Sequence, residues 1–257
     1  MATWNPQQYL RFKDERTQPS IDLAAKVRVD KPAAVIDVGC GPGNSTQVLR
    51  QRWPDSRIIG LDSSSEMIAK AKKDFPDQEW LLADASRLEP DRTYDVVFSN
   101  AVLQWIPEHD LLVPRLLGIV NAGGALAIQV PANNESPLHR ALLYISSGKK
   151  WARFTAGCEK LLHYHTVEHY YNILYPIVSS GLEIWETTYY HVLSSHAALI
   201  EWYKGTGLRP FLEKLPGDEY RKEFMDEVLN ECKQGYYIHG DGKILFPFRR
   251  IFFVAYK

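Results

Sequence analysis

Residues 35–46 have the sequence VIDVGCGPGNST, in which a short apolar run passes into a glycine-rich turn. Val35, Ile36 and Val38 are β-branched, and such a run before glycine is typical of a strand in a parallel sheet covered on both faces. A helix is expected over residues 45–52, and its free N–H groups would favour an anionic ligand at the turn. The segment therefore predicts a strand, a ligand-binding turn and a helix.

The spacing of the glycines narrows the kind of ligand. Gly39, Gly41 and Gly43 form G-x-G-x-G, and Asn44 stands where a dinucleotide site, G-x-G-x-x-G, has its third glycine. A pyrophosphate needs that glycine for close packing, whereas a ligand with one carboxylate needs less room. Asp37 lies inside the apolar run, which costs stability unless the carboxylate is paired with turn N–H groups or a ligand. Together these features favour S-adenosylmethionine (SAM) over a dinucleotide.

Polar residues also follow the next three expected strands. Asp62 ends the first of them, where a carboxylate can accept hydrogen bonds from both ribose hydroxyls. Asp84 follows the second, where it can accept the adenine amino group, and Asn100 follows the third. Ser63 and Glu66 have the spacing of a capping box and predict the start of a helix. The predicted cofactor-binding residues are Asp37, Gly39, Cys40, Gly41, Gly43, Asp62, Ser63, Met67, Asp84, Ala85 and Asn100.

Alternation of strands and helices over residues 33–129 is the pattern of a doubly wound α/β sheet. The five expected strands of this part cover residues 35–38, 57–61, 80–82, 94–98 and 125–130. Strand-like composition returns over 183–192 and 248–256. We therefore expect the whole chain, 1–257, to form one domain with a Rossmann-like seven-stranded sheet and a helical cap, contributed by insertions at about 131–165 and 194–245.

The N-terminal segment is expected to precede the sheet as helices. Residues 7–28 predict two short helices, because Pro19 interrupts their apolar positions. Trp4, Tyr9 and Phe12 would either belong to a segment that closes over the glycine turn or pack against the sheet.

The composition argues against several classes of partner. The chain has 257 residues, of which 30 are basic and 31 acidic, so no long-range field attracts it to nucleic acid or to an anionic membrane. No apolar run approaches the ~20 residues of a membrane span. We therefore expect a small-molecule partner, and neither nucleic acid nor a membrane.

The cysteines and histidines favour a cytoplasmic protein without a metal. Cys40, Cys158 and Cys232 are widely spaced and form no C-x-x-C, which fits a reducing compartment and argues against disulfides or zinc. The histidines between residues 163 and 169 lack a nearby carboxylate or cysteine set, so we expect them to pack or face solvent. The sequence has no G-x-S-x-G elbow, which weakens a hydrolase interpretation.

Candidate substrate-binding residues come from the second half of the chain and from the end of the fourth strand. Arg209 lies between Gly207 and Pro210, a rigid setting for a guanidinium that binds a carboxylate. Arg249 and Arg250 adjoin an apolar strand. The predicted substrate-binding residues are Gln104, Trp105, Tyr189, Tyr190, His191, Arg209 and Arg249. The alternative is that the aromatic residues cover a sheet edge and the arginines form surface ion pairs worth under ~1 kcal/mol.

The motif DVGCGPG at 37–43, with Asp62 and Asp84, resembles that of class I SAM-dependent methyltransferases. Nearly the whole chain, although little of 137–165, further resembles the trans-aconitate methyltransferases among them. The segments that carry this resemblance are Trp4-Asn5-Pro6 with Tyr9-Leu10, Asn44-Ser45-Thr46, Gln51-Arg52-Trp53-Pro54, Leu103-Gln104-Trp105, Thr188-Tyr189-Tyr190-His191, Thr206-Gly207-Leu208-Arg209-Pro210 and residues 247–253. The resemblance implies methyl transfer from SAM to one carboxylate of trans-aconitate, a tricarboxylate, to give a monomethyl ester.

Such chemistry needs no catalytic acid or base. A carboxylic acid with a pKa near ~4 is already ionised at neutral pH, so alignment of its oxygen with the methyl group is sufficient. Tyr189, Tyr190 or His191 would still be available as a base for a phenolic substrate. The alternatives are a methyltransferase for another small acidic or phenolic metabolite, a nicotinamide-dependent oxidoreductase, and a SAM-binding regulator without turnover.

Overall fold

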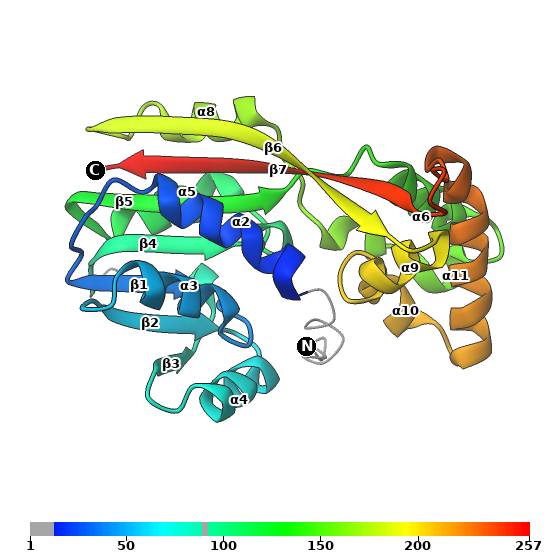
Figure 1. The fold of residues 1–257 in the computed structure, drawn as a ribbon, viewed down its shortest axis with the longest axis horizontal. Coiled ribbons are helices and arrows are strands. Elements are labelled where there is room, and N and C mark those ends of the chain that lie inside the picture. Colours follow the sequence, from blue (N-terminus) through cyan, green and yellow to red (C-terminus); the bar gives the residue numbers. More distant parts are fainter. Residues whose placement is uncertain (1–12, 89–91) are drawn as a thin grey trace. The chain divides into compact units, whose positions relative to one another are not determined.

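A computed structural model describes residues 13–88 and 92–257, within which seven strands form one sheet in the order β3-β2-β1-β4-β5-β7-β6 (Figure 1). The strands are β1 Ala34–Val38, β2 Arg57–Asp62, β3 Glu79–Leu82, β4 Tyr94–Asn100, β5 Val120–Pro131, β6 Gly181–Leu193 and β7 Ile244–Tyr256. The pairs β1–β2, β1–β4, β2–β3 and β4–β5 are parallel, whereas β7 runs against β5 in Figure 1. The predicted Rossmann-like, seven-stranded sheet is confirmed.

Strand order determines where a ligand can bind. β1 lies between β2 and β4. The chain adds β2 and β3 on one side of β1 and then crosses to the other side of β1, where it forms β4. In an open α/β sheet, a change of direction of this kind opens a crevice at the carboxyl ends of the strands. The four residues before the glycine turn, Val35 to Val38, are fully buried, and they form the floor beneath this crevice.

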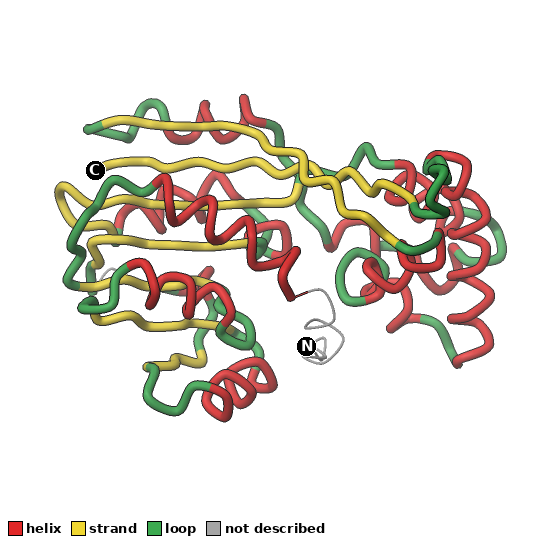
Figure 2. The backbone as a smooth tube through the Cα atoms, viewed as in Figure 1, coloured by secondary structure: helices red, strands yellow, loops and turns green. Residues whose placement is uncertain are grey.

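Helices join the strands, and in the second half of the chain they cover more residues than the strands do (Figure 2). The α-helices are α2 Lys13–Lys26, α3 Asn44–Arg52, α4 Ser65–Asp74, α5 His109–Gly118, α6 Pro137–Ser147, α7 Ala152–Thr155, α8 Val167–Leu174, α9 His196–Lys204, α10 Arg209–Lys214 and α11 Asp218–Cys232. Short 3₁₀ turns are η1 Ala85–Arg87, η2 Leu103–Trp105, η3 Cys158–Leu161 and η4 Lys233–Gly235. No helix in the described ranges is both long and apolar enough to cross a membrane.

The prediction that Pro19 separates two helices is wrong, because α2 continues through this residue. Proline removes one backbone hydrogen bond and costs about 3 kcal/mol in a helix interior. Burial of Leu23 and Ala24 on the same helix, and of Val27 directly after it, offsets that cost, since each buried aliphatic side chain contributes roughly 1–3 kcal/mol. The residues expected either to close over the glycine turn or to pack against the sheet, Trp4, Tyr9 and Phe12, lie outside the described residues.

The capping residue of α4 also differs from the prediction. Ser64, rather than Ser63, is the N-cap, and its hydroxyl oxygen accepts a hydrogen bond from the Met67 amide at 3.2 Å. Its own hydroxyl donates to Glu66. The S-x-x-E spacing favours Ser63, but the Ser64 amide donates a hydrogen bond to Asp62 at 2.8 Å, and this bond fixes the turn before the helix.

The chain divides into two compact units. One, here called the helical unit, comprises Ala132–Tyr164 and Thr188–Arg250. The other, the sheet unit, comprises the described residues up to Pro131 together with His165–Thr187 and Ile251–Lys257. β6 and β7 each contribute residues to both units. Almost all of the two segments predicted as cap insertions falls in the helical unit, and the description of the chain as a single domain stays a prediction.

Candidate active site

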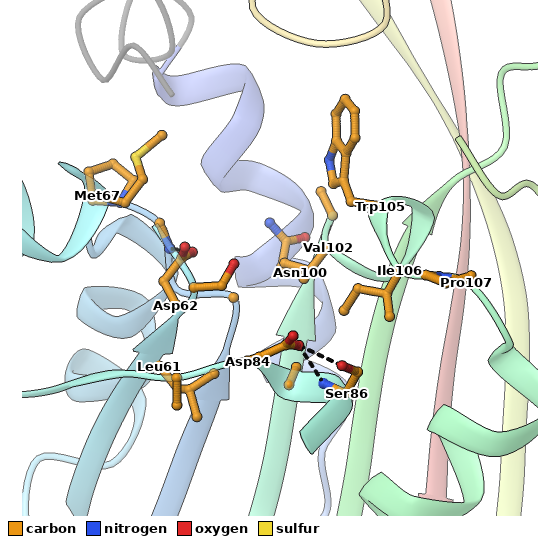
Figure 3. A pocket seen from close by; sticks show the side chains of 17 residues that line it. Leu61, Asp62, Met67, Asp84, Ser86, Asn100, Val102, Trp105, Ile106 and Pro107 are labelled. Atoms are coloured by element: carbon orange, nitrogen blue, oxygen red, sulfur yellow. Dashed lines mark hydrogen bonds between the residues drawn. The ribbon is translucent and has the colours of Figure 1, made fainter. Parts of the chain in front are cut away.

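A cavity of about 290 Å³ lies in the sheet unit at the carboxyl ends of β1, β2, β3 and β4 (Figure 3). We call it the main cavity. Of the predicted cofactor-binding and substrate-binding residues, those that line it are Gly39, Gly41, Asp62, Ser63, Met67, Asp84, Ala85, Asn100 and Trp105. Residues from four strand ends therefore meet at one cavity, as the sequence pattern predicts for the crevice of a doubly wound sheet.

The glycine turn brings backbone to the cavity wall. The amides of Gly39 and Cys40 both donate to the Leu61 carbonyl, at 2.7 and 2.8 Å, and so tie the turn to β2. A Cβ at Gly39 would lie 2.2 Å from the Val102 side chain, and Gly43 has a φ of 100° at the N-cap of α3. A residue with a side chain would clash at the first position and be strained at the second.

Asp62 holds the backbone of two turns and still has lone pairs that can accept hydrogen bonds from a ligand. Its Oδ2 accepts a hydrogen bond from the Gly41 amide at 2.9 Å, and its Oδ1 accepts one from the Ser64 amide at 2.8 Å. Burial raises the pKa of the Asp62 carboxyl, while these amide hydrogen bonds lower it. Each carboxylate oxygen has a second lone pair, so this side chain can still accept hydrogen bonds from a ligand in the main cavity.

Asp84 stands at the end of the neighbouring strand. Its Oδ1 accepts hydrogen bonds from the amide of Ser86 at 2.9 Å and from the Ser86 hydroxyl at 2.7 Å, as drawn in Figure 3. These bonds make Asp84 the N-cap of η1 and hold the carboxylate at the cavity wall. Asp84 is thus placed to accept a further hydrogen bond from a polar ligand group.

Three predicted cofactor-binding residues do not line the main cavity. Asp37 is fully buried beneath the turn, where its Oδ2 accepts hydrogen bonds from Ser45 Oγ at 2.7 Å and Thr46 Oγ1 at 2.6 Å. Burial raises the pKa of this carboxyl to about 6. Burial likewise raises the pKa of the Cys40 thiol. Gly43 lies against the rings of Trp80 and Phe75 and does not line the cavity. Asp37 and Gly43 therefore support the shape of the turn and are not part of the cavity wall.

A second, much smaller cavity of about 20 Å³ adjoins the main cavity, because Gly39, Pro42 and Asn100 line both. We call it the small cavity. Arg16 of α2, which is only 7% exposed, lines it together with Asn44 and Cys40. Among the described residues, Asn44 Nδ2 and Asn100 Oδ1 are buried and have no hydrogen-bond partner. The small cavity therefore offers a cation, a free donor and a free acceptor.

Sequence reasoning missed Arg16 and Asn44 as candidate ligand contacts. Asn44 was visible as the residue that replaces a third glycine, and this position next to the turn is the signal that could have found it. Arg16 lies on α2, and β1 separates this helix from the glycine turn. Nothing in the local sequence pattern distinguishes Arg16 from the other charged residues of α2. Only the packing of α2 on α3 turns its guanidinium inward.

The segment from Ala101 to Glu108 forms another side of the main cavity. Trp105 lines the cavity, and Figure 3 draws it on the side away from Met67. Gln104, the other residue predicted here to bind substrate, is buried and its Nε2 donates to the Ala101 carbonyl at 2.7 Å. Gln104 is therefore used inside the segment and does not line the cavity.

The remaining predicted substrate-binding residues belong to the helical unit. His191 is buried and stacks on Trp202 with a centroid distance of 4.4 Å, and Tyr189 is stacked 6.5 Å from His191. The Arg250 guanidinium lies 4.5 Å above the Phe248 ring and 5.8 Å from the Tyr189 ring. Tyr189, His191 and Arg250 thus share one aromatic cluster, whereas Tyr190 on the opposite face is exposed.

The two arginines of the predicted set differ in their surroundings. Arg209 begins α10 with a largely buried side chain, its Nε lies 3.9 Å from Glu213, and burial lowers the pKa of the guanidinium. Arg249 is exposed, and its Nε donates to the Ala132 carbonyl at 3.0 Å. Arg250, next to it on the strand, is 4% exposed and is the more protected of the pair.

The three histidines of the 163–169 region do not gather a metal-binding set. The described residues contain no group of histidine, cysteine or carboxylate side chains arranged to hold a metal ion. His165 stacks on His169 at 3.9 Å and lies 4.5 Å from the His109 ring, whereas His163 belongs to the helical unit. Packing between α5 and α8 accounts for two of these rings.

Comparison with solved structures identifies the same fold in proteins of low sequence identity, one of which is described as a putative methyltransferase. The YcgJ protein of Bacillus subtilis is 12% identical and has a TM-score of 0.61 over 93% of this chain and 98% of its own. A putative methyltransferase of Bacillus halodurans is also 12% identical, with a TM-score of 0.55 over 94% of this chain and 98% of its own. At this identity the likeness concerns the fold.

Comparison of sequences is more specific. The family model described as "Methyltransferase domain" matches residues 35–124, the part that contains the glycine turn and Asp62. Proteins named trans-aconitate 2-methyltransferase from Azoarcus sp., Rhodopseudomonas palustris and Methylobacterium radiotolerans are 43%, 42% and 40% identical. Each alignment covers 100% of this chain and at least 99% of the relative. The chain therefore belongs to the trans-aconitate 2-methyltransferase family.

Proposed function

We propose that this chain is a SAM-dependent methyltransferase that esterifies one carboxylate of trans-aconitate. The observation that carries the proposal is the main cavity, where Asp62 and Asp84 end neighbouring strands beside the glycine turn. The substrate is taken from the relatives, which are 40% to 43% identical over essentially the whole chain and carry that name. A nicotinamide-dependent oxidoreductase is not supported, because the chain belongs to a methyltransferase family.

The residues of the main cavity fit the nucleoside part of SAM. Asp62 has lone pairs available for the ribose hydroxyls, in the position where the carboxylate of a dinucleotide site binds them. Asp84, held by Ser86, accepts the adenine amino group, with Ala85 beside it. Met67 supplies an apolar, adaptable contact at the same cavity.

The polar groups that line the small cavity match the amino-acid end of the cofactor. That end carries a carboxylate and an ammonium group, which need hydrogen-bond donors and an acceptor respectively. Asn44 Nδ2 and the Arg16 guanidinium are the donors for the carboxylate, and Asn100 Oδ1 is the acceptor for the ammonium. The N-terminus of α3 adds a favourable dipole for the negative charge.

Bound SAM supplies an electrophilic methyl group, and the residues of the chain bind and orient the carboxylate that receives it. A substrate carboxylate is ionised at neutral pH, so no side chain has to remove a proton. The chain contributes alignment, which can supply on the order of 7–11 kcal/mol, and exclusion of water. Trp105, Ile106 and Pro107 give the main cavity an apolar side suited to that exclusion.

The spare carboxylates of the substrate require cations. Arg209 has the stronger case, because its buried guanidinium is screened from water and begins a helix at a fixed position. Arg249 is a second candidate. The aromatic cluster of Tyr189 and His191 supports recognition of the planar unsaturated part of the substrate, and Tyr190 with His191 would assist only a substrate that must lose a proton. Gln104 and Trp105 complete the predicted set.

A direct assay tests the activity. Purified full-length chain would be incubated with SAM and a panel of trans-aconitate, cis-aconitate, isocitrate, citrate and simple phenols, and products would be identified by mass spectrometry. The expected result is a product one methylene heavier than trans-aconitate, with S-adenosylhomocysteine, formed faster than from the other acids. Turnover of phenols alone would reject the substrate. Binding of S-adenosylhomocysteine without any turnover would indicate a regulator.

The three cysteines bear on where the reaction takes place. Cys40, Cys158 and Cys232 are all free and buried. Free thiols of this kind are typical of a reducing compartment. We therefore assign the reaction to the cytoplasm, and fractionation of the native organism with an antibody to the chain would test this assignment.

A further inference from the structure

His109 is a buried imidazole of the sheet unit that the activity described above does not use. It is 1% exposed and begins α5. Its Nε2 lies 2.8 Å from the Leu103 carbonyl oxygen and 3.0 Å from the Ile106 carbonyl oxygen, and its Nδ1 lies 2.9 Å from the Tyr170 hydroxyl. A carbonyl oxygen only accepts, so Nε2 must carry the hydrogen. In the neutral ring Nδ1 is then the acceptor for the Tyr170 O–H, so that ring has one defined tautomer.

The two carbonyls belong to the segment that forms one side of the main cavity. Val102, Trp105, Ile106 and Pro107 all line that cavity. A single N–H therefore bonds to two carbonyls inside this cavity wall. Because Val102 packs where a Cβ on Gly39 would stand, the position of the wall also determines how closely it approaches the glycine turn.

This wall needs such a bond, because its backbone is strained at both ends. Ala101 and Glu108 each have a φ of 58°, in the left-handed region that residues with a Cβ rarely adopt. Such conformations persist only where the surroundings hold them. His109 directly follows the second strained residue and bonds to carbonyls inside the segment, so it is positioned to hold the strained path.

A second layer holds the imidazole itself. Tyr170 is fully buried on α8 and packs against Phe253 at a centroid distance of 5.0 Å. The titratable groups in contact with His109 are Tyr170 and His165. His169 stacks on His165, and Asp110 lies 3.9 Å from His169. Hydrogen bonds and ring contacts thus connect α8 through His109 to the wall of the main cavity.

We propose that His109 is a positioning residue for the cofactor: through Nε2–H it fixes the Ala101–Glu108 wall of the main cavity, and Tyr170 fixes the tautomer that makes this possible. The inference rests on the proposed use of the main cavity for SAM. The bonds from Nε2 to the two carbonyls fix the cavity wall directly. The bond between Nδ1 and Tyr170 acts only indirectly, because it keeps the hydrogen on Nε2.

Two amide substitutions separate these bonds. The side-chain amide of His109→Gln reaches the place of Nε2, and that of His109→Asn reaches the place of Nδ1. Binding of S-adenosylhomocysteine to the full chain would be measured by calorimetry, together with thermal unfolding. We expect His109→Gln to bind within about threefold of the unsubstituted chain and His109→Asn to bind about tenfold more weakly, as the loss of one buried hydrogen bond predicts. Equal affinities of the two variants, or losses that only follow their melting temperatures, would overturn the proposal.

A spectroscopic measurement on the unsubstituted chain does not depend on how the variants fold. Two-dimensional ¹H–¹⁵N spectra of histidine-labelled protein would report the tautomer of His109, assigned by comparison with His169→Gln and Tyr170→Phe. A neutral ring with the hydrogen on Nε2 is expected, and a hydrogen on Nδ1 would overturn the proposal. If the unsubstituted chain fails to bind S-adenosylhomocysteine, the proposed use of the cavity fails, while the tautomer still decides whether His109 can hold the wall.

Discussion

Asp62 Oδ2 accepts a hydrogen bond from the Gly41 amide at 2.9 Å, so one carboxylate joins the end of β2 to the glycine turn that follows β1. The residue proposed to bind the ribose therefore also sets the position of the backbone that faces the ligand. A change at Asp62 should consequently affect the cofactor twice, by removal of an acceptor and by release of the turn.

Asp62→Asn tests this double role. An amide has only one oxygen, so the side chain cannot accept from both amides and the ligand at once. We expect the dissociation constant for S-adenosylhomocysteine to rise about 10- to 100-fold, the loss expected for a hydrogen bond to a charged group. Asp55→Asn, an exposed residue close in sequence, is the matched control and should bind like the unsubstituted chain. An Asp62→Asn variant with full affinity would show that the ribose is not bound here.

Asp37 gives a prediction for stability against pH. Burial raises the pKa of this carboxyl from 3.8 in the unfolded chain to about 6 in the fold. Between these values the folded chain binds a proton that the unfolded chain has released, so this group's contribution to the unfolding free energy falls as pH rises. The decrease amounts to roughly 3 kcal/mol and levels off once pH has risen past the folded pKa, above about pH 6.5.

Asp37→Asn isolates that contribution. The variant cannot titrate here, so its unfolding free energy relative to the unsubstituted chain should increase between about pH 4 and pH 6.5 and then stay level. Urea unfolding at a series of pH values measures the difference. A difference that does not change over this range would mean that the folded carboxyl titrates as in the unfolded chain.

Thr46→Val, which removes one donor to the same carboxylate, should destabilise the fold by about 1–3 kcal/mol at neutral pH.

Much of the main cavity could be predicted from sequence because its residues follow directly from local patterns. A strand is recognised by its apolar run, and the polar residue that ends it is then fixed by position, as for Asp62 and Asp84. All five strands of the parallel part were located for this reason, although β5 begins at Val120, five residues before the expected strand. The same locality explains the error at the start of α4, where the S-x-x-E spacing favours Ser63 but a hydrogen bond from the Ser64 amide to Asp62 fixes the turn and Ser64 is the cap.

The parts that sequence reasoning missed depend on packing between distant elements. Arg16 faces the small cavity only because α2 packs on α3, and no spacing within α2 identifies it. The role of His109 becomes visible only when α8 brings Tyr170 beside it. Pro19 misled in the same way, since a local helix-breaking preference is outweighed by burial that the sequence does not show.

Asn44→Asp tests the small cavity with opposite effects on stability and binding. An acidic residue in the first turn of α3 interacts favourably with the helix dipole, so the fold should keep or gain a few tenths of a kcal/mol. A second negative charge beside the carboxylate of the cofactor should nevertheless weaken binding of S-adenosylhomocysteine about tenfold or more. Calorimetry and thermal unfolding measure the two effects. Unchanged affinity would place the amino-acid end of the cofactor elsewhere.

The strain at Glu108 predicts a stabilising glycine. Glu108 is exposed, has a φ of 58° and makes no side-chain capping bond, so Glu108→Gly removes an unfavourable Cβ contact. The unfolding free energy should rise by about 0.5–1 kcal/mol. Asp110→Gly, two residues further on inside α5, is the contrasting control and should lower it by about the same amount. Equal destabilisation by both substitutions would contradict the strained backbone.

Arg209 provides the test of substrate binding. A guanidinium that holds a spare carboxylate contributes two charge-assisted hydrogen bonds, and a neutral amide cannot replace them. Arg209→Gln should raise the KM for trans-aconitate roughly tenfold or more and leave the affinity for S-adenosylhomocysteine unchanged. Arg249→Gln should give the same pattern with a smaller effect, because its exposed side chain is screened by water. Arg153→Gln, an exposed arginine of the same unit, is the control. An unchanged KM in both Arg209→Gln and Arg249→Gln would remove these arginines from the substrate site and direct the search to Arg250, whose guanidinium is buried in the aromatic cluster.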